Sequence, residues 1–131
     1  MKNPKLLLID DDARIRAMIS KYLQGSGFDV ITAANCAEAR KLNNAKVELA
    51  LIDLMLPDGS GLELVEQFRK DFPEQVLVMI SGEASLSDAV KATKFGAVDF
   101  LEKPVSPEKI EITINNALRL NKLNRRIESE H

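Results

Sequence analysis

Five short apolar runs recur along the chain, and a stretch with hydrophobic residues at helical spacing follows each of them. The runs cover residues 5–9, 28–32, 49–52, 76–80 and 98–101. Short apolar runs bounded by polar or turn residues are typical of strands buried on both faces of a parallel sheet. Because right-handed crossovers place the connecting helices on both sides of such a sheet, the pattern predicts a doubly wound α/β fold with five parallel strands.

The helical stretches begin and end at residues that suit helix termini. They cover residues 13–24, 36–42 and 62–68, a segment that ends at 95, and a final helix from near 107. Asn35 can cap the second helix, and either Ser85 or Ser87 can cap the fourth. Gly96 can close the fourth helix. No repeat or low-complexity segment interrupts the alternation, which indicates one domain.

Four of the five predicted strands end at polar residues. These are Asp10 and Asp11 after the first strand, Asp53 after the third, Ser81 after the fourth, and Lys103 two positions beyond the fifth. Because the carboxyl ends of parallel strands share one edge, where open α/β sheets bind ligands, we expect these side chains to converge on one pocket. Each also has an ordinary explanation: the aspartates as helix caps or turn residues, the serine as a turn residue, the lysine as a solvated loop residue.

The converging side chains would favour a hard metal ion and an anionic ligand. Three neighbouring carboxylates repel one another unless a cation joins them or one keeps a proton. Oxygen ligands without histidine or thiolate suit Mg²⁺. Lys103 adds a second positive charge and Ser81 a hydroxyl donor, which together favour phosphoryl transfer. Asp53 is then the natural nucleophile, since an aspartate is ionised at neutral pH and needs no general base.

The composition excludes several classes of protein and of binding site. The length of 131 residues suits one domain, and the net charge of −2 with interspersed signs gives no surface for direct binding of nucleic acid. The single cysteine, Cys36, excludes an internal disulfide, and with the single histidine, His131, it makes a structural zinc site implausible. His131 is the last residue, a poor catalytic candidate, and is open to explanation as a tag remnant. No run approaches the roughly 20 apolar residues of a membrane helix, so we expect a cytoplasmic protein without membrane contact.

Four motifs together resemble those of response-regulator receiver domains. They are LLLIDDD, LIDLMLPDGSG, VMISGEAS and DFLEKP, in the usual order between about residues 5 and 118. The resemblance implies a flavodoxin-like, CheY-like sheet with strand order 2-1-3-4-5. It also implies a function: the domain accepts a phosphoryl group from a histidine kinase and switches conformation to regulate an output. Such a domain catalyses its own phosphorylation and dephosphorylation but is not a turnover enzyme.

The same resemblance assigns roles to individual residues. Asp53 is implied to be the phospho-acceptor, with Lys103 pairing the phosphate. Mg²⁺ is implied to be held by Asp11, Asp53 and the backbone carbonyl of Met55, with Asp10 acting through water. Ser81 is implied to be the switch hydroxyl and Phe100 the switch aromatic. Two positions depart from the common pattern, because threonine is commoner at 81 and tyrosine is common at 100.

A narrower similarity concerns the segment SGEASLSDAVKATKFGAVDFLEKP and the long helix after it. These features resemble receivers of the nitrogen-regulation (NtrC-like) type of transcription activator. The later domains of such activators, an ATPase and a DNA-binding helix pair, are not in this sequence.

Two other functions compete with the receiver assignment. Asp10 and Asp12 form a DxD pair after the first strand, which is similar to haloacid-dehalogenase-type phosphatases using Asp10 as nucleophile. The chain lacks room for the later paired acids of those enzymes. A flavodoxin-like nucleotide module is the non-enzymatic alternative, but three acids at the end of the first strand would repel its phosphate.

The last helix is expected to outrun the receiver domain. We assign residues 1–118 to the domain and 119–131 to a helical extension, because residues 117–130 contain no proline or glycine. A narrow apolar seam of coiled-coil spacing runs along it, formed by Ala117, Leu120, Leu123 or Asn124, and Ile127. The seam predicts a weak homodimer that also uses the face formed by the fourth helix, the fifth strand and the last helix. A frayed, solvated tail is the alternative.

Overall fold

The computed structural model describes residues 3–83 and 85–129, and side chains of the last helix to residue 124. Within these residues, five parallel strands form the main sheet in the order β2-β1-β3-β6-β7. Their bounds are β1 Lys5–Ile9, β2 Asp29–Ala33, β3 Leu49–Asp53, β6 Val76–Ser81 and β7 Asp99–Glu102. Counting long strands alone, this is the order 2-1-3-4-5, so the predicted doubly wound fold is confirmed.

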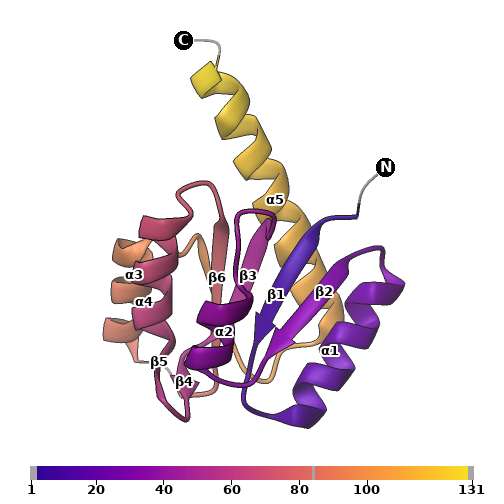
Figure 1. Cartoon of the computed structure of the whole chain (residues 1–131), viewed down its shortest axis with the longest axis vertical. Helices are drawn as coiled ribbons and strands as arrows, with labels where there is room; N and C mark the ends of the chain where they lie inside the picture. Colours follow the sequence, from indigo (N-terminus) through magenta and orange to yellow (C-terminus); the bar gives the residue numbers. More distant parts are fainter. Residues whose placement is uncertain (1–2, 84, 130–131) are drawn as a thin grey trace.

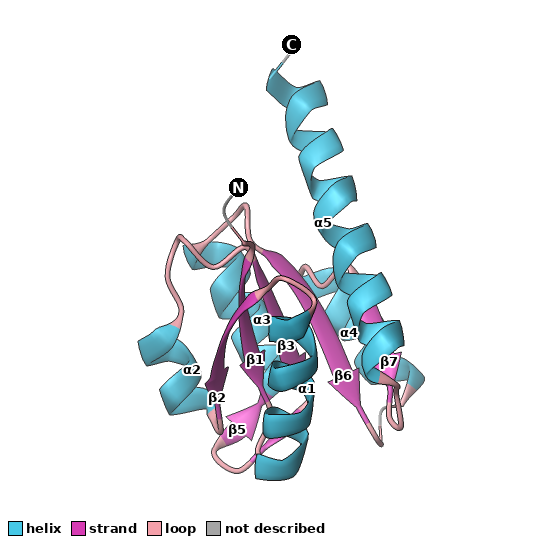
Figure 2. Ribbon diagram, turned by 90° about the vertical axis from the view of Figure 1, so that its right-hand side faces the viewer, coloured by secondary structure: helices cyan, strands magenta, loops and turns pink. Residues whose placement is uncertain are grey.

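Helices cover both faces of this sheet (Figures 1 and 2). On one face lie α1 and α5, and on the other lie α2, α3 and α4. Their bounds are α1 Ala13–Gly25, α2 Cys36–Leu42, α3 Gly61–Asp71, α4 Leu86–Phe95 and α5 Pro107–Ser129. In the described residues, no helix is long and apolar enough to cross a membrane.

The central strands are apolar at successive positions because each face packs on a separate core. In β1, Leu6 and Leu8 pack with α1 and α5, whereas Leu7 and Ile9 pack with α2 and α3. Every residue of β3 is buried. A strand covered on both faces has no polar side, which explains the unbroken apolar runs in the sequence.

Helix caps follow the sequence expectations at two helices and differ at α1. Asn35 caps α2, and Ser85, not Ser87, caps α4 through reciprocal bonds with Asp88. At α1, the side chain of Asp12 accepts hydrogen bonds from the first amides of the helix. The alternative that Asp10 or Asp11 caps this helix is therefore wrong, which leaves both carboxylates available to the sheet edge.

A small antiparallel hairpin follows β3, where the sequence predicted only a loop. Its strands are β4 Met55–Leu56 and β5 Gly59–Ser60. The turn residues Pro57 and Asp58 connect them, and Ser60 caps α3 directly afterwards. Two-residue strands leave no periodic signal in a sequence, so the expectation of an irregular loop was incomplete.

Helix α5 continues past the sheet and projects from the edge opposite the carboxyl ends of the strands (Figure 1). Ile110, Ile114 and Leu118 pack against the sheet, whereas Leu120 and Leu123 are exposed. The side chain of Ile127 and all of His131 lie outside the described residues. The helix therefore extends beyond residue 118 as expected, while its use as a dimer seam stays a prediction.

Candidate functional site

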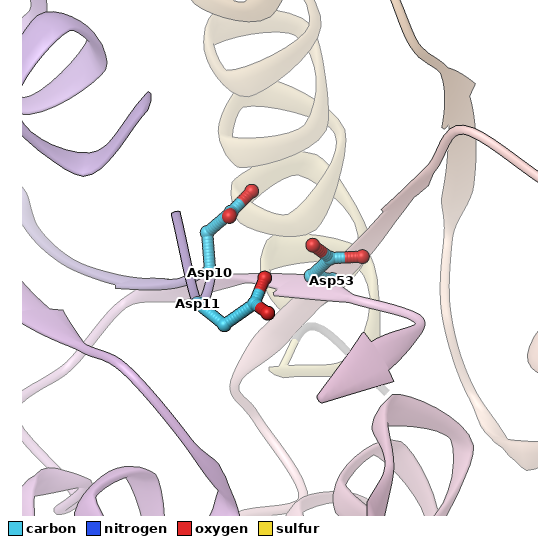
Figure 3. A group of neighbouring side chains, drawn as sticks. All are labelled: Asp10, Asp11 and Asp53. Atoms are coloured by element: carbon cyan, nitrogen blue, oxygen red, sulfur yellow. The ribbon is translucent and has the colours of Figure 1, made fainter. Parts of the chain in front are cut away.

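Asp10 and Asp53 stand side by side at the carboxyl edge of the sheet (Figure 3). Asp10 directly follows β1 and Asp53 is the last residue of β3, two strands that are hydrogen-bonded neighbours. Both are deeply buried, with 1% and 5% of their surface exposed. The apolar strands carry the two carboxylates to this edge, where the chain turns into loops.

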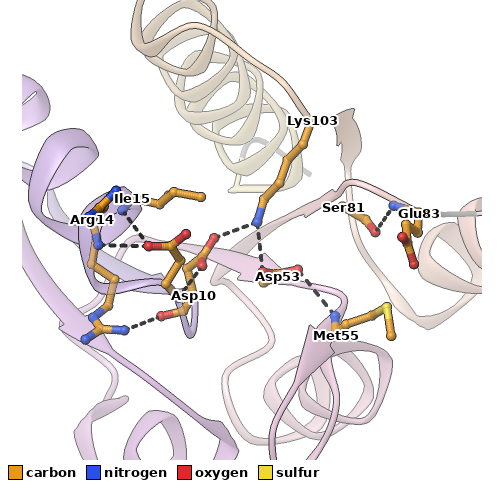
Figure 4. A network of polar contacts seen from close by, with 10 residues as sticks. Asp10, Arg14, Ile15, Asp53, Met55, Ser81, Glu83 and Lys103 are labelled. Carbon is orange, nitrogen blue, oxygen red and sulfur yellow. Dashed lines mark hydrogen bonds and ion pairs between the residues drawn. The ribbon is translucent and has the colours of Figure 1, made fainter.

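Lys103 bridges these two carboxylates (Figure 4). It follows β7, and its Nζ lies 2.9 Å from Oδ2 of Asp10 and 3.0 Å from Oδ2 of Asp53. Burial alone would lower the pKa of Lys103, but the hydrogen bonds to the two aspartates outweigh this effect and raise it. The side chain is therefore held as an ammonium ion between two acids that come from strands far apart in the sequence.

Two effects oppose each other at Asp53. Burial raises the pKa of Asp53, and the hydrogen bond and charge of Lys103 lower it only in part, so the net direction is upward. The negative charge of Asp10 adds to the rise. The remaining oxygen, Oδ1, accepts a hydrogen bond from the amide of Met55 at 3.3 Å. Asp53 is thus oriented at both oxygens, and additional positive charge would favour its ionised form.

A third carboxylate, that of Asp11, completes an acidic cluster. One oxygen from each of Asp10, Asp11 and Asp53 lies within 4.8 Å of the others, and Asp11 is exposed to solvent. An all-oxygen set of this kind fits a hard divalent ion that keeps several waters, as Mg²⁺ does. The residues present therefore suit the metal that the sequence predicts.

The two predicted switch residues lie on β6 and β7, on the other side of β3 from β1. Ser81 ends β6 and is buried, and among the described residues its hydroxyl is bonded to the amide of Glu83 at 3.2 Å. Phe100 on β7 is partly buried against the core under α3 and α4. The structure therefore brings together the predicted residues Asp10, Asp11, Asp53 and Lys103. Ser81 lies at the end of β6 (Figure 4), and Phe100 lies on β7.

The sequence did not predict one contact of the hairpin β4–β5, which follows Asp53. The carboxylate of Asp58 accepts hydrogen bonds from the amides of Cys36 and Ala37 at the start of α2. The partners are 22 and 21 positions away, so no local capping pattern could indicate them. Only the placement of an acid in a turn beside a glycine marked Asp58 as a loop residue.

Known proteins match the chain over nearly its whole length. Residues 6–115 match the family described as response regulator receiver domain. Response regulator protein PilR of Pseudomonas aeruginosa is 39% identical over 121 residues, which is 92% of this chain and 27% of PilR. The chain spans about a quarter of the length of the curated relatives it matches.

Solved structures share the fold. A CheY-like receiver from Methanospirillum hungatei JF-1 has a TM-score of 0.89 and 32% identity, covering 94% of this chain and 99% of its own. A Burkholderia pseudomallei response regulator with a phosphorylated aspartic acid, a calcium ion and citrate has a TM-score of 0.80 and 32% identity, covering 97% and 73%. The beryllofluoride-activated NtrC4 receiver domain dimer has a TM-score of 0.83 and 33% identity, covering 89% and 98%.

Proposed function

The chain belongs to the response regulator receiver domains of two-component systems, and we propose that Asp53 is its phospho-acceptor. The observation that carries this proposal is the buried Asp53 carboxylate at the end of the central strand, paired with Lys103 beside two further acids. The phosphorylated aspartic acid of the Burkholderia pseudomallei regulator, a protein of the same fold, supports it.

The proposed reaction transfers a phosphoryl group from a histidine of the sensor kinase. A carboxylate oxygen of Asp53 forms a bond to phosphorus, the bond from phosphorus to the imidazole nitrogen breaks, and that nitrogen keeps the electron pair. The ammonium of Lys103 pairs with a phosphoryl oxygen. Because Lys103 contacts both buried aspartates, it can turn toward the incoming group while its charge stays at the site.

We assign the metal site to Asp11, Asp53 and the backbone carbonyl of Met55, with Asp10 acting through water. A bound Mg²⁺ would neutralise charge on the phosphoryl oxygens and on the acids that face them. Asp10 is nearly inaccessible and is bonded to Lys103 and to the amide of Asp12, which suits a supporting role.

We assign the switch to Ser81 and Phe100. A phosphoryl group on Asp53 adds strong acceptors, which favour the conformation in which the Ser81 hydroxyl leaves Glu83 and turns toward them. Phe100 then moves into the space that the serine vacates, and the face of α4, β7 and α5 repacks. Differential binding of the added group to the two conformations is what shifts this equilibrium.

We further propose that residues 1–118 form the receiver and 119–131 a linking extension through which two copies associate weakly. The exposed Leu120 and Leu123 on α5, and the dimeric state of the NtrC4 receiver, support this. We place the protein in the cytoplasm, with a sensor histidine kinase as its phosphodonor. By analogy with the NtrC-like relatives, the output is regulation of transcription.

Mass spectrometry after treatment with acetyl phosphate and Mg²⁺ tests the central proposal. One acid-stable, base-labile phosphoryl group is expected, located at Asp53 by peptide mapping. The Asp53→Ala variant should stay unlabelled, and labelling equal to that of the parent would overturn the assignment. Steady multiple turnover of a phosphate ester, without retained label, would instead support a phosphatase.

A further inference from the structure

Asp58 ties the site loop to a helix that carries no site residue. It lies in the turn of the hairpin β4–β5, and its two carboxylate oxygens accept separate hydrogen bonds: Oδ1 from the amide of Cys36 at 2.7 Å and Oδ2 from that of Ala37 at 3.0 Å. We propose that Asp58 is a positioning residue, which holds the hairpin where Met55 faces Asp53 for binding of the divalent cation. This inference rests on the proposed function.

The bonds of Asp58 are of the strong kind. A carboxylate that accepts backbone amides at the start of a helix makes charge-assisted hydrogen bonds and also faces the positive end of the helix dipole. The two amide bonds lower the pKa of Asp58, so it is ionised under all conditions in which the domain would work. Among the described residues, the side chain of Asn35, the local cap, accepts a hydrogen bond from the next amide, that of Glu38. The hairpin therefore completes the cap of α2, and α2 in turn fixes the hairpin.

The outer part of the hairpin has one further support besides Asp58, because Leu56 is partly buried against the core under α2 and α3. Its strands pair Met55 with Ser60 and Leu56 with Gly59, and the side chain of Met55 is exposed. Its inner end is fixed because the amide of Gly61 donates to the carbonyl of Leu54 at 2.7 Å. The amide of Met55 reaches Asp53 at the long distance of 3.3 Å, a contact that a small shift of the hairpin would break. The tie at Asp58 therefore acts together with the packing of Leu56 to fix where the backbone of Met55 lies.

The test compares Asp58→Ala and Asp58→Asn with Asn35→Ala in the full chain. All three remove or weaken a cap of α2, but only the first two release the hairpin. Mg²⁺ affinity is measured by amide NMR titration, well below the unfolding temperature of each variant. In Asp58→Ala the dissociation constant should rise roughly tenfold, the usual effect of losing a residue that orients a metal ligand. Asp58→Asn, with one acceptor oxygen left, should fall in between, and Asn35→Ala should stay close to the parent.

A second measurement needs no metal. In Asp58→Ala without Mg²⁺, the amide signal of Met55 should shift and its hydrogen exchange should accelerate, while Asn35→Ala leaves both unchanged. Equal Mg²⁺ affinity in Asp58→Ala and the parent would overturn the positioning role alone, as would an equal loss in Asn35→Ala. A parent chain that binds no Mg²⁺, or that binds it equally well as Asp53→Ala, would overturn the proposed metal site and this inference together.

Discussion

Helices α3 and α4 cover the same face of the sheet but are held there in different ways. Helix α3 buries Gly61, Leu64, Val65 and Phe68. Helix α4, all of whose residues are described, buries Ala92 alone and leaves Leu86 82% and Val90 46% exposed. Buried apolar area is the main source of stability, so α3 belongs to the fixed part of the molecule and α4 does not.

Hydrogen bonds at the two ends of α4 hold the helix in place where its buried apolar contacts are few. Its first turn is closed by reciprocal bonds between Ser85 and Asp88. At its last turn, the guanidinium of Arg69 on α3 donates to the carbonyl of Gly96 at 2.9 Å and to that of Pro73 at 2.7 Å. A helix attached mainly at its ends can change position at low cost, because moving it exposes little apolar surface. The contrast teaches that the proposed acceptor Asp53 precedes the rigid helix, whereas the proposed switch residue Ser81 precedes the adaptable one.

The largest difference between the two helices is expected from truncating one side chain in each. Phe68→Ala should lower the free energy of unfolding by about 3–5 kcal/mol, because it leaves a cavity in the core under α3. Val90→Ala should change it by less than about 1 kcal/mol. Urea unfolding followed by circular dichroism measures both. Similar losses in the two variants would show that α4 is as firmly packed as α3.

A glycine substitution probes the junction between Asp53 and α3. A Cβ at Gly61 would collide with the backbone carbonyl of Asp53, whereas at Gly25 it would meet nothing within 4 Å. Gly61→Ala should therefore destabilise the domain by about 1–3 kcal/mol and slow labelling of Asp53 by acetyl phosphate. Gly25→Ala is the matched control and should leave both unchanged. A normal labelling rate in a folded Gly61→Ala protein would show that the close fit of α3 to the backbone of Asp53 does not affect the reaction at that residue.

Removing the cap of α4 should have a smaller and local effect. Ser85→Ala should cost about 1 kcal/mol and speed amide hydrogen exchange within α4 but not within α3. Ser87→Ala, in the same turn but not the cap, is the control. Acceleration spread evenly over both helices would mean that α4 unfolds only with the whole domain.

The smallest effect concerns the pH dependence of stability, which has opposite signs at Asp88 in α4 and at Asp53, the end of the strand that leads to α3. Bonds from the Ser85 amide and hydroxyl hold the pKa of Asp88 below its ordinary value of 3.8. A lowered pKa in the folded state means that ionised Asp88 adds stability above that value and loses it as the pH falls further. The parent should therefore unfold at a higher temperature than Asp88→Asn at pH 7, and this difference should disappear near pH 2–3.

Asp53 provides the contrasting case, since burial raises its pKa above 3.8. A raised pKa means that its ionised form opposes folding, and that stability is gained as the pH falls through the raised value. Asp53→Asn should therefore be more stable than the parent at pH 7, by a margin that shrinks on acidification. A margin that grows instead would show that Lys103 outweighs burial at this carboxylate.

Local signals in the sequence account for what could be predicted. The apolar runs located every long strand to within one residue, because strands covered on both faces admit few polar residues. The convergence of Asp10, Asp53 and Lys103 followed from the shared edge of parallel strands. Where bounds shifted, as in β2 starting at Asp29, the preceding Phe28 is buried in the core outside the strand.

The features that could not be predicted depend on contacts between segments far apart in the sequence. Nothing near Asp58 in the sequence indicates that it caps a helix begun at Cys36, and nothing near Arg69 indicates that it closes α4. The sequence offered Asp10 and Asp11 as possible caps of α1, but Asp12 is the cap. Three consecutive acids compete for this one position at the start of the helix. Which residue caps a helix in these cases depends on contacts between segments that are far apart in the sequence, and such contacts leave no local pattern from which they could be predicted.

The projection of α5 from the far edge of the sheet has a mechanical consequence. As one continuous helix of 23 residues, α5 is a stiff rod about 34 Å long, held by its first half. Because the half beyond residue 118 is free and about 17 Å long, a tilt of about 5° at the sheet moves its tip by about 1.5 Å. Small rotations at the sheet can thus become displacements about as large as a covalent bond at the far end of α5.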